Sequence, residues 1–257
     1  MSIPVLHVNK DHRQTFVSSS KGDQLKWKID QLWGKANKFG YEGLAEWVAS
    51  ELIARSNISS TLIVPYKQCL LIENDIQYVG CFSEDFLRPG ESLITLHRIL
   101  ESYGVKFDEI LKGQSTRDSV LSVVEFLKRV LNLDTLEYFS VMLPLDAILL
   151  NEDRHLNNIA FIHGSEGYRL CPFFDHGLSL MSDTKDYPLS MPVSVGMRKV
   201  KAKPFSSDFS KQVHALETNL QFNRSSVLEF IEQYDQALGR VSQILRSQIR
   251  KYEHLFI

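Results

Sequence analysis

Two short polar stretches enclose an apolar hairpin in the second half of this chain. Residues 151–158 read NEDRHLNN, and residues 172–177 read PFFDHG. The apolar runs Ile159–His163 and Tyr168–Phe174 are separated by a Gly-Ser-Glu-Gly turn at residues 164–167, which is typical of a β-hairpin. Because a hairpin returns the chain to the end from which it started, we expect the two polar stretches to lie side by side.

The polar residues of these stretches are those that phosphoryl transfer needs. Asp153 precedes Asn158 by five residues, and Asp175 follows Asn158 by 17, enough for a short hairpin. One carboxylate orients the acceptor hydroxyl and accepts its proton, while an asparagine and a second carboxylate hold Mg²⁺ against the nucleotide phosphates. The base must be ionised, and we expect Mg²⁺ and basic groups such as Arg154 to favour that state of Asp153.

Upstream of this centre, the first third of the chain is rich in predicted strands around one helix. Residues 24–29 alternate between polar and apolar side chains, which indicates a half-buried strand. Residues 41–55 place Leu44, Val48 and Leu52 on one stripe of a helix. The further predicted strands are Val5–Val8, Thr15–Val17, Leu62–Tyr66, Cys69–Ile72 and Gln77–Phe82.

After Phe82 the pattern becomes helical. Residues 116–131 carry an apolar stripe at helical spacing. The very apolar stretch Tyr138–Leu150 contains Pro144, which we expect to bend or interrupt a helix. Residues 225–252 have the pattern of one long amphipathic helix that ends the chain.

The two halves predict an α+β fold of two lobes. The N-terminal lobe, residues 1–82, is small and β-rich with one helix, and the C-terminal lobe, residues 83–257, is larger and mainly helical. A chain of 257 residues is long enough for two lobes that share a cleft.

Composition and charge exclude several classes of protein. The chain has 29 lysine and arginine residues against 31 aspartate and glutamate residues and a net charge of −2, which argues against direct DNA binding or membrane binding by the whole surface. No apolar run reaches the roughly 18–20 residues that span a bilayer, and the first residues lack a secretory signal pattern. Three widely spaced cysteines, Cys69, Cys81 and Cys171, are expected to be buried free thiols. We therefore expect a cytoplasmic protein.

The motifs resemble those of a known kinase family. Residues 153–158 (DRHLNN) with residues 175–177 (DHG) resemble the D-R-H-x-x-N and D-F-G pair of phosphatidylinositol 3-kinase-like enzymes. They are more similar still to HipA-like bacterial serine/threonine kinases, whose catalytic loop reads D-x-H-x-x-N. Residues 41–46 (YEGLAE) resemble the helix that follows the nucleotide-lysine strand in compact HipA-like proteins. The resemblance extends over about residues 15–256 and implies a bilobal protein-kinase-like fold, without the N-terminal subdomain of the full-length toxins, that uses ATP and Mg²⁺.

The resemblance implies roles for the residues of the C-terminal motifs. Asp153 would be the catalytic base, and His155 would lie near the transferred phosphate. Asn158 and Asp175 would bind Mg²⁺. His155 has an alternative reading, in which it only holds the loop by hydrogen bonds.

The N-terminal lobe would supply the nucleotide-binding residues. The resemblance implies that Lys28 contacts the α- and β-phosphates and that Glu46 on the helix orients it. Lys26 and Glu42 are the nearby alternatives. These two positions are less specific than the motifs of the C-terminal half.

Two further segments would contact the nucleotide. Residues 79–82 (VGCF) would form the hinge whose backbone binds the adenine edge, and residues 18–22 (SSSKG) would lie over the phosphates. The chain lacks a G-x-G-x-x-G motif there, as HipA-like proteins do, and by this resemblance Ser18, Ser19 or Ser20 would be autophosphorylated. The residues expected to bind the nucleotide from these segments are Ser19, Ser20, Gly22, Val79, Cys81 and Phe82.

The resemblance also implies partners. The acceptor would be a protein, such as an aminoacyl-tRNA synthetase or another translation component, and the chain would act as a toxin of a toxin–antitoxin system with an antitoxin or small partner protein. A lipid or small-molecule kinase, a non-catalytic nucleotide-binding module and an AMP-transferring enzyme are the alternatives.

Two features have bland interpretations beside functional ones. Asp146 lies inside an apolar run, where a buried carboxylate paired with backbone or an arginine is the favoured interpretation. Residues 198–203 (RKVKAK) carry four positive charges. Such a run is usually a solvated face, and the functional alternative is a docking patch for an acidic protein or a tRNA-bearing target.

Overall fold

The computed structural model of this chain describes residues 3–14 and 24–257. The predicted strand Thr15–Val17 lies outside the described residues. So do the candidate phosphate-loop residues Ser18, Ser19, Ser20 and Gly22.

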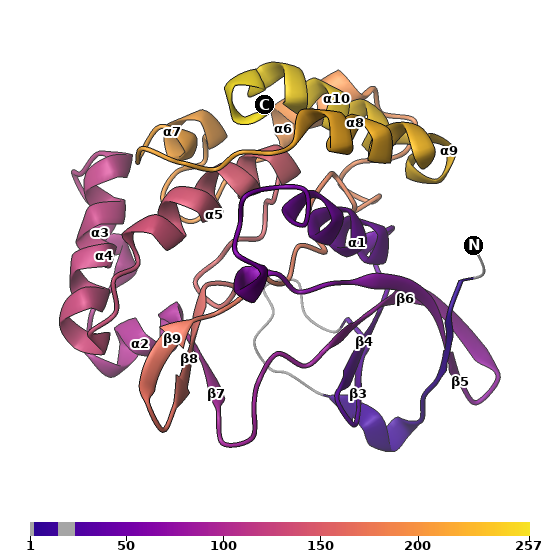
Figure 1. The fold of residues 1–257 in the computed structure, drawn as a ribbon, viewed down its shortest axis with the longest axis horizontal. Helices are drawn as coiled ribbons and strands as arrows, with labels where there is room; N and C mark the ends of the chain where they lie inside the picture. Colours follow the sequence, from indigo (N-terminus) through magenta and orange to yellow (C-terminus); the bar gives the residue numbers. More distant parts are fainter. Residues whose placement is uncertain (1–2, 15–23) are drawn as a thin grey trace.

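Six strands of the described N-terminal region form one sheet in the order β1-β5-β6-β4-β3-β2, in which only β1 and β5 are parallel. Figure 1 shows this sheet on one side of the molecule, with the helices above and beside it. The strands are β1 (Val5–His7), β2 (Arg13–Gln14), β3 (Lys26–Ile29), β4 (Leu32–Ala36), β5 (Lys67–Glu73) and β6 (Ile76–Glu84).

The sheet confirms four predicted strands, which are β1, β3, β5 and β6. It differs from the expectation at the short strand β2, at β4 and at one predicted strand that does not form. Strand β4 was not expected, because the turn before it has no Asn-Gly or Asp-Gly pair; Asp30 adopts a positive φ of 51° there instead. The predicted strand Leu62–Tyr66 is wrong. A 3-10 turn at Ser60–Leu62 begins this segment, and Ile63 makes only an isolated bridge to Phe173.

Helix α1 (Glu42–Ile53) lies between the sheet and the C-terminal helices (Figure 1). It contacts β4, β5 and β6 on one side. On the other side, the Trp47 ring meets Phe230 and Tyr234 edge-on, with centroids 5.3 and 5.1 Å away. Val48 and Leu52 belong to the large apolar core of the helical region, whereas Trp27 and Leu71 form a separate small core under the sheet. The helix therefore packs against both the sheet and the core of the helical region.

Two glycines allow close backbone contacts, one between α1 and the sheet and one between two strands of the sheet. A Cβ on Gly43 would lie 2.7 Å from the carbonyl carbon of Gly80 in β6, and a Cβ on Gly80 would lie 2.0 Å from the carbonyl oxygen of Lys35 in β4. The Asn37 side chain adds to the helix–sheet contact, because its Oδ1 accepts a hydrogen bond from the Gly43 N–H at 2.7 Å. The helix–sheet distance therefore depends on the absence of a side chain at Gly43, and the spacing of β6 and β4 depends on its absence at Gly80.

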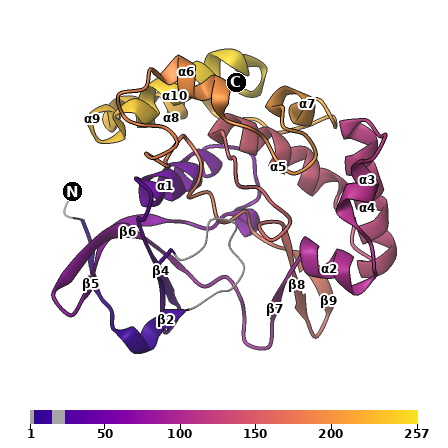
Figure 2. The same cartoon turned by 180° about the vertical axis from the view of Figure 1, so that it is seen from behind.

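The second part of the chain contains a three-stranded sheet and most of the helices. Figure 2 shows the strands β7, β8 and β9 beside α2 and below α5. Strands β8 and β9 are the predicted hairpin. The elements are β7 (Ser92–Thr95), α2 (Leu96–Ser102), α3 (Phe107–Leu111), α4 (Thr116–Leu131), α5 (Leu136–Leu149), β8 (Ala160–Gly164), β9 (Gly167–Leu170), α6 (Val193–Lys199), α7 (Phe209–Val213), α8 (Arg224–Gln233), α9 (Asp235–Leu238) and α10 (Arg240–Lys251).

The architecture is α+β, as predicted, and two helical expectations change. Helix α5 continues through Pro144 without interruption. The predicted single helix over residues 225–252 is wrong, since the chain forms α8, α9 and α10 there. Gly239, with φ of 53° and ψ of −124°, separates the last two helices, a conformation that glycine reaches without a Cβ penalty.

The predicted boundary after Phe82 falls two residues before the end of β6, and the division into residues 1–82 and 83–257 stays a prediction. All three cysteines are buried free thiols, as expected. Among the helices of the described residues, none combines the length and the apolar character needed to cross a bilayer.

Substituting Gly43→Ala tests the close helix–sheet contact. The added methyl group would clash with the Gly80 backbone, and we expect the free energy of unfolding to fall by about 1–3 kcal/mol, measured by urea denaturation. Gly164→Ala is the control, because a Cβ there would meet only the flexible Glu91 side chain at 3.3 Å. Equal stabilities of the two variants would contradict the close-contact argument.

Candidate active site

The loop that carries Asp153 begins at the C-terminal end of α5. Leu150 follows the helix with a positive φ of 50°, which turns the chain away from the helix axis. Asn151 then bonds back to the helix, because its Nδ2 donates to Asp146 Oδ1 at 2.8 Å. Its Oδ1 accepts a hydrogen bond from the backbone N–H of Asp153 at 3.1 Å. These bonds fix the part of the loop that presents Asp153.

Arg154 is fully buried, and each of its five N–H groups has an acceptor. Nε and one Nη nitrogen donate to the two carboxylate oxygens of Asp146, each at 2.9 Å. The other Nη nitrogen donates to the carbonyl oxygens of Asn158 at 2.7 Å and Phe174 at 3.1 Å. His176 Nε2 lies 3.0 Å from the first Nη nitrogen. One guanidinium thus joins α5, the candidate catalytic loop and the segment that follows the hairpin.

Two expectations about this arginine have different outcomes. The interpretation of Asp146 as a buried carboxylate paired with an arginine is confirmed. Arg154 gives Asp153 no hydrogen bond, because a guanidinium has only five donors and other groups accept from all of them. That its charge favours the ionised state of Asp153 stays a prediction.

His176 is held as a neutral imidazole. An arginine can only donate, so His176 Nε2 accepts from Arg154 and the proton lies on Nδ1, 4.0 Å from Glu46 Oε2. Burial, and then the positive charge of Arg154, lower the pKa of His176 well below its usual value. The backbone N–H of His176 donates to the same Glu46 oxygen at 2.9 Å. This residue connects the arginine to α1.

A buried lysine joins the two lobes. Lys35 Nζ, on β4, is 2.6 Å from Glu46 Oε1 and 2.9 Å from Asp175 Oδ1, and its side chain is only 9% exposed. Burial acts to lower the pKa of Lys35, but the two carboxylates outweigh it and raise that pKa well above its usual value. The ammonium group therefore stays charged and ties the sheet to α1 and to the segment after β9.

Asp175 combines a strained backbone with a strongly stabilised negative charge. Its φ of 60° lies in the left-handed region, which is uncommon for residues other than glycine and clusters at functional sites. Burial acts to raise the pKa of its carboxyl group, but the Lys26 and Lys35 ammonium groups lower it far below its usual range. Asp175 is therefore an anion throughout the neutral pH range.

Asn158 and Asp175 fit a divalent cation that keeps other ligands of its own. Asn158 Nδ2 donates to the carbonyl oxygen of Asp153 at 2.9 Å, so Oδ1 is the atom left to face a cation. Mg²⁺ prefers oxygen ligands and usually takes only one or two protein groups together with phosphate oxygens and waters. In the part of the chain that the structure describes, no three His, Cys, Asp or Glu side chains form a ready metal cage. The donor set thus suits Mg²⁺ bound together with a nucleotide.

His155 presents an unused donor beside Asp153. Its Nδ1 accepts a hydrogen bond from the backbone N–H of Asn157 at 3.2 Å, so the proton of the neutral ring lies on Nε2. Burial lowers the pKa of His155, and Lys203 acts in the same direction, while Asp153 opposes them. Within the described residues, the buried Nε2 has no hydrogen-bond partner, and it lies 3.7 Å from Asp153 Oδ2. The ring can therefore donate to a bound group.

The predicted pair of Lys28 and Glu46 is wrong. Lys28 Nζ is 2.7 Å from Asp85 Oδ2, with its side chain 39% exposed, and it lies over the Trp33 ring at 5.2 Å. The cause is the unpredicted hairpin: β4 inserts between β3 and β6 in the sheet, so its own lysine is the one that reaches α1.

Glu46 rather than the alternative Glu42 is the carboxylate that meets the lysine. Glu42 accepts hydrogen bonds from three backbone N–H groups, those of Lys38, Phe39 and Gly40, at 2.6–2.9 Å. Its carboxylate is therefore occupied in shaping the turn that precedes α1.

The predicted hinge at residues 79–82 is also wrong. Val79, Cys81 and Phe82 lie inside β6, where the backbone is paired with β5 on one side and with β4 or the residue after it on the other. The backbone N–H and C=O groups of a central strand form hydrogen bonds with the two neighbouring strands, so these residues have none available for an adenine edge. The chain leaves the sheet only at residues 85–91, between β6 and β7.

Sequence reasoning missed two residues of the site. Lys35 stands between Gly34 and Ala36 at the end of an apolar run, and a lysine in a strand with small buried neighbours was the signal available. Lys203 was noted only as part of a basic strip. Its Nζ lies 3.5 Å from Asp153 Oδ1, a long-range contact between residues 50 positions apart that no local pattern predicts.

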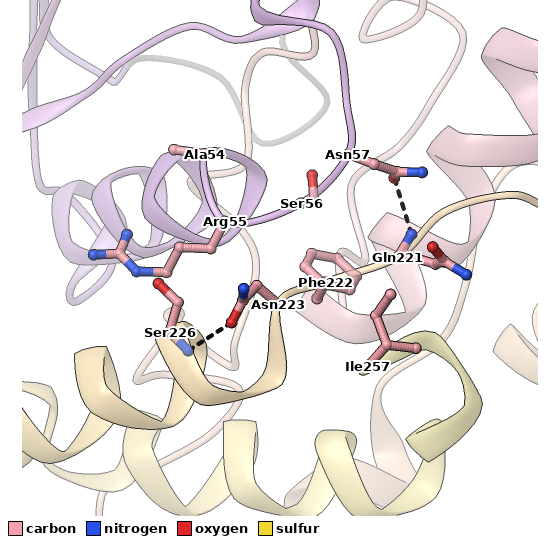
Figure 3. A pocket seen from close by; sticks show the side chains of 9 residues that line it. All are labelled: Ala54, Arg55, Ser56, Asn57, Gln221, Phe222, Asn223, Ser226 and Ile257. Carbon is pink, nitrogen blue, oxygen red and sulfur yellow. Dashed lines mark hydrogen bonds between the residues drawn. The ribbon is translucent and has the colours of Figure 1, made fainter.

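A separate cavity of about 640 Å³ lies at the other end of α1 (Figure 3). Arg55 is nine residues beyond Glu46, a distance of about 13 Å along a helix, so the cavity is not part of the candidate active site. Two of its lining residues are joined by a hydrogen bond from the Gln221 N–H to Asn57 Oδ1 at 2.9 Å. Its lining residues are Ala54, Arg55, Ser56, Asn57, Gln221, Phe222, Asn223, Ser226 and Ile257.

Comparisons with known proteins agree with this geometry. The family model described as the HipA-like C-terminal domain matches residues 88–242, more than half of the chain. Among solved structures, the chain is similar to the crystal structure of the Helicobacter pylori proinflammatory kinase CtkA, with a TM-score of 0.55 and 15% sequence identity over 98% of this chain and 95% of that one. At this identity the likeness shows a kinase-like fold. Among curated proteins, none matches this chain.

The neutral His176 predicts how stability depends on pH. Because its pKa is lowered in the folded state, the unfolded chain binds a proton below about pH 6.5 and the folded chain does not, so stability falls as the pH falls. Between pH 7.5 and 5.5, His176 alone is expected to reduce the free energy of unfolding by about 1.4 kcal/mol, measured by urea denaturation.

In His176→Phe this part of the pH dependence should vanish, although the variant is less stable at both pH values. His163→Gln, at an exposed histidine, is the control and should keep the wild-type dependence. An unchanged dependence in His176→Phe would show that the buried imidazole is not its source.

Proposed function

The chain belongs to the family of proteins with a HipA-like C-terminal domain, and from this premise we propose that it is an ATP-dependent kinase that transfers the γ-phosphate of ATP to a serine or threonine hydroxyl of a protein. The observation that carries the proposal is the meeting of Lys35, Glu46 and Asp175. A lysine held by a helix glutamate, beside an aspartate placed to bind a metal, is the phosphate-binding arrangement of protein kinases.

Asp153 acts as the general base in this proposal. Its carboxylate accepts the proton of the acceptor hydroxyl while the hydroxyl oxygen forms a bond to the γ-phosphorus. The bond from that phosphorus to the bridging oxygen breaks, and ADP leaves with the electron pair. The hydrogen bond from the Asp153 N–H to Asn151 supports the position of the base.

His155 Nε2–H donates to an oxygen of the phosphoryl group in transit. A neutral donor at this point stabilises the charge that develops there. The orphaned, buried Nε2 atom next to Asp153 supports this role over a purely structural one.

Asn158 and Asp175 would hold Mg²⁺. Bound there, the ion neutralises negative charge on the nucleotide phosphates. Lys35 adds a second positive charge on the same side, since one oxygen of Asp175 already contacts it. Lys26, next to Lys35 across the β3–β4 pair, adds to the positive field that the phosphates meet.

The adenine would lie against the segment that leaves β6. Phe86 packs with Phe174, ring centroids 5.9 Å apart, and gives this segment an apolar side. Asp85 forms an ion pair with Lys28, so in this proposal Lys28 supports the segment that would serve as the hinge.

Finer points follow from the family resemblance. We propose that Ser18, Ser19 or Ser20 receives a phosphate from the enzyme itself, and that the acceptor is a translation component such as an aminoacyl-tRNA synthetase. An antitoxin or small partner protein would restrain the activity, as for the toxin of a toxin–antitoxin system. The buried free thiols are consistent with a reducing compartment such as the cytoplasm.

Asp153→Ala tests the proposed base. With γ-labelled ATP and Mg²⁺, we expect the wild-type protein to label serine or threonine residues of itself or of a protein acceptor, and the variant to lose about 10²–10⁴-fold in rate. Intact mass and phosphopeptide mapping measure this. Asp108→Ala, at an exposed position in α3, is the matched control. An added nucleotide mass, or labelled lipid without labelled protein, would replace this proposal with one of its alternatives.

Exchange of the two lysines tests the correction to the sequence-based assignment. Lys35→Met removes a charged contact to the phosphates, and the dissociation constant of Mg-ATP is expected to rise about 10–100-fold, measured by calorimetry. Lys28→Met should change it by less than about threefold, because Lys28 pairs with Asp85 on a partly exposed surface. The reverse order of the two effects would restore the original assignment of Lys28.

A further inference from the structure

Three lysines at alternate positions, Lys199, Lys201 and Lys203, extend from α6 to the candidate general base, and we call them the lysine file. Lys199 ends α6, and Lys201 and Lys203 follow at alternate positions, all three exposed. Val200 and Ala202 between them are buried in the main core. This alternation is that of an extended segment, in which side chains two residues apart point to the same side about 6.6–7 Å from each other.

A buried glutamine holds the end of this file in place. Gln212, on α7, is fully buried, and its Nε2 donates to the carbonyl oxygen of Lys203 at 3.0 Å. Its Oε1 accepts hydrogen bonds from the backbone N–H groups of Phe205 and Ser206. The backbone position of Lys203 is therefore set by the core.

Lys203 reaches from solvent to the reacting end of the site. Its Nζ lies 3.5 Å from Asp153 Oδ1, with the lysine side chain 47% exposed and the aspartate 13% exposed. An acceptor hydroxyl that gives its proton to Asp153 must lie within hydrogen-bond reach of that carboxylate. Lys203 is therefore a neighbour of any acceptor.

The rest of the file has no acidic partner in the chain as described. Over residues 3–14 and 24–257, no carboxylate forms an ion pair with Lys199 or Lys201. Three exposed positive charges at alternate positions of the sequence, two of them without an ion-pair partner among the described residues, make a surface that favours an anionic occupant.

We propose that Lys201 and Lys203 select the acceptor: the hydroxyl is presented on an extended segment whose acidic side chains, at the second and fourth positions to one side of it, meet these two lysines. The inference rests on the proposed kinase function and names its substrate class, a serine or threonine flanked by aspartate or glutamate. An extended peptide has the same two-residue repeat as the lysine file, so its acidic side chains and the lysines match in spacing.

The geometry favours a peptide over a lipid surface as the occupant. A membrane is flat and attracts broad basic patches, whereas these lysines stand in single file and end beside a largely buried carboxylate. A narrow chain can follow that line to Asp153.

Three synthetic peptides test the proposal. Each has one serine in an alanine–glycine background, with glutamates at the second and fourth positions after it, glutamates at the same positions before it, or glutamines at all four. With wild-type protein, ATP and Mg²⁺, we expect one of the acidic peptides to exceed the glutamine peptide by about tenfold in kcat/KM.

Variants of the two lysines separate selection from a structural role. Lys201→Met should lose about threefold on the acidic peptide and leave the glutamine peptide nearly unchanged. Lys203→Met also removes the contact to Asp153, so it should lower kcat/KM on both peptides, and on the acidic peptide more. Lys201→Glu should prefer a peptide with lysines in place of the glutamates. Lys112→Met, an exposed lysine between α3 and α4, is the control and should keep the wild-type preference.

Binding without ATP separates this inference from the proposed function. A fluorescent acidic peptide should bind the wild-type protein more tightly than Lys201→Met, even if no phosphate is transferred, in which case the kinase proposal fails and the lysine surface stands. Equal phosphorylation and binding of acidic and glutamine peptides would overturn the inference and leave the kinase proposal intact. Preference for phosphatidylinositol vesicles over every peptide would also overturn it.

Discussion

The buried guanidinium of Arg154 is the interaction on which the rest of the site depends. It donates to both oxygens of Asp146 in α5, and every one of its five N–H groups has a protein partner. Two of those partners are the carbonyl oxygens of Asn158 and Phe174, which belong to the two stretches proposed to bind the metal. A buried charge without its partner costs about 3–5 kcal/mol, so Arg154 can be buried only while it is paired with Asp146. The same guanidinium holds the two loops together through the carbonyl oxygens of Asn158 and Phe174.

Helix α1 extends this arrangement to the sheet. Its Trp47 face is part of the core of the helical lobe, and Gly43 lets its other face approach β6. In protein kinases, the position of the equivalent helix controls whether its glutamate meets the lysine. Here, displacement of α1 would expose apolar side chains of the main core, so packing keeps Glu46 within 2.6 Å of Lys35. At the other end of the candidate catalytic loop from Asn158, Lys203 lies 3.5 Å from Asp153.

The local parts of the site were the ones open to prediction. Loop residues such as Asp153, Asn158 and Asp175 stand at a spacing that only needs the hairpin between them, and the hairpin has its own apolar and turn signals. The partner of Glu46 was not open to prediction in this way. Its identity depends on strand β4, and the turn before β4 contains Asp30 in a left-handed conformation without the usual glycine. Because this strand was not expected, the predicted lysine, Lys28, lies seven residues before the lysine that meets Glu46, Lys35.

By itself, the amino-acid sequence determined the α+β class, the hairpin, and the candidate acid and amide groups Asp153, Asn158 and Asp175, because short-range periodicity and spacing indicate each of these. Only the tertiary structure decided which lysine is buried against Glu46, where the chain leaves the sheet, and that Lys203 meets Asp153. Those contacts join residues far apart in the chain, and their free energy comes from the packing of α1 and the burial of paired charges. Helix packing and charge burial both arise only when distant parts of the chain fold against each other, so a sequence pattern does not reveal them.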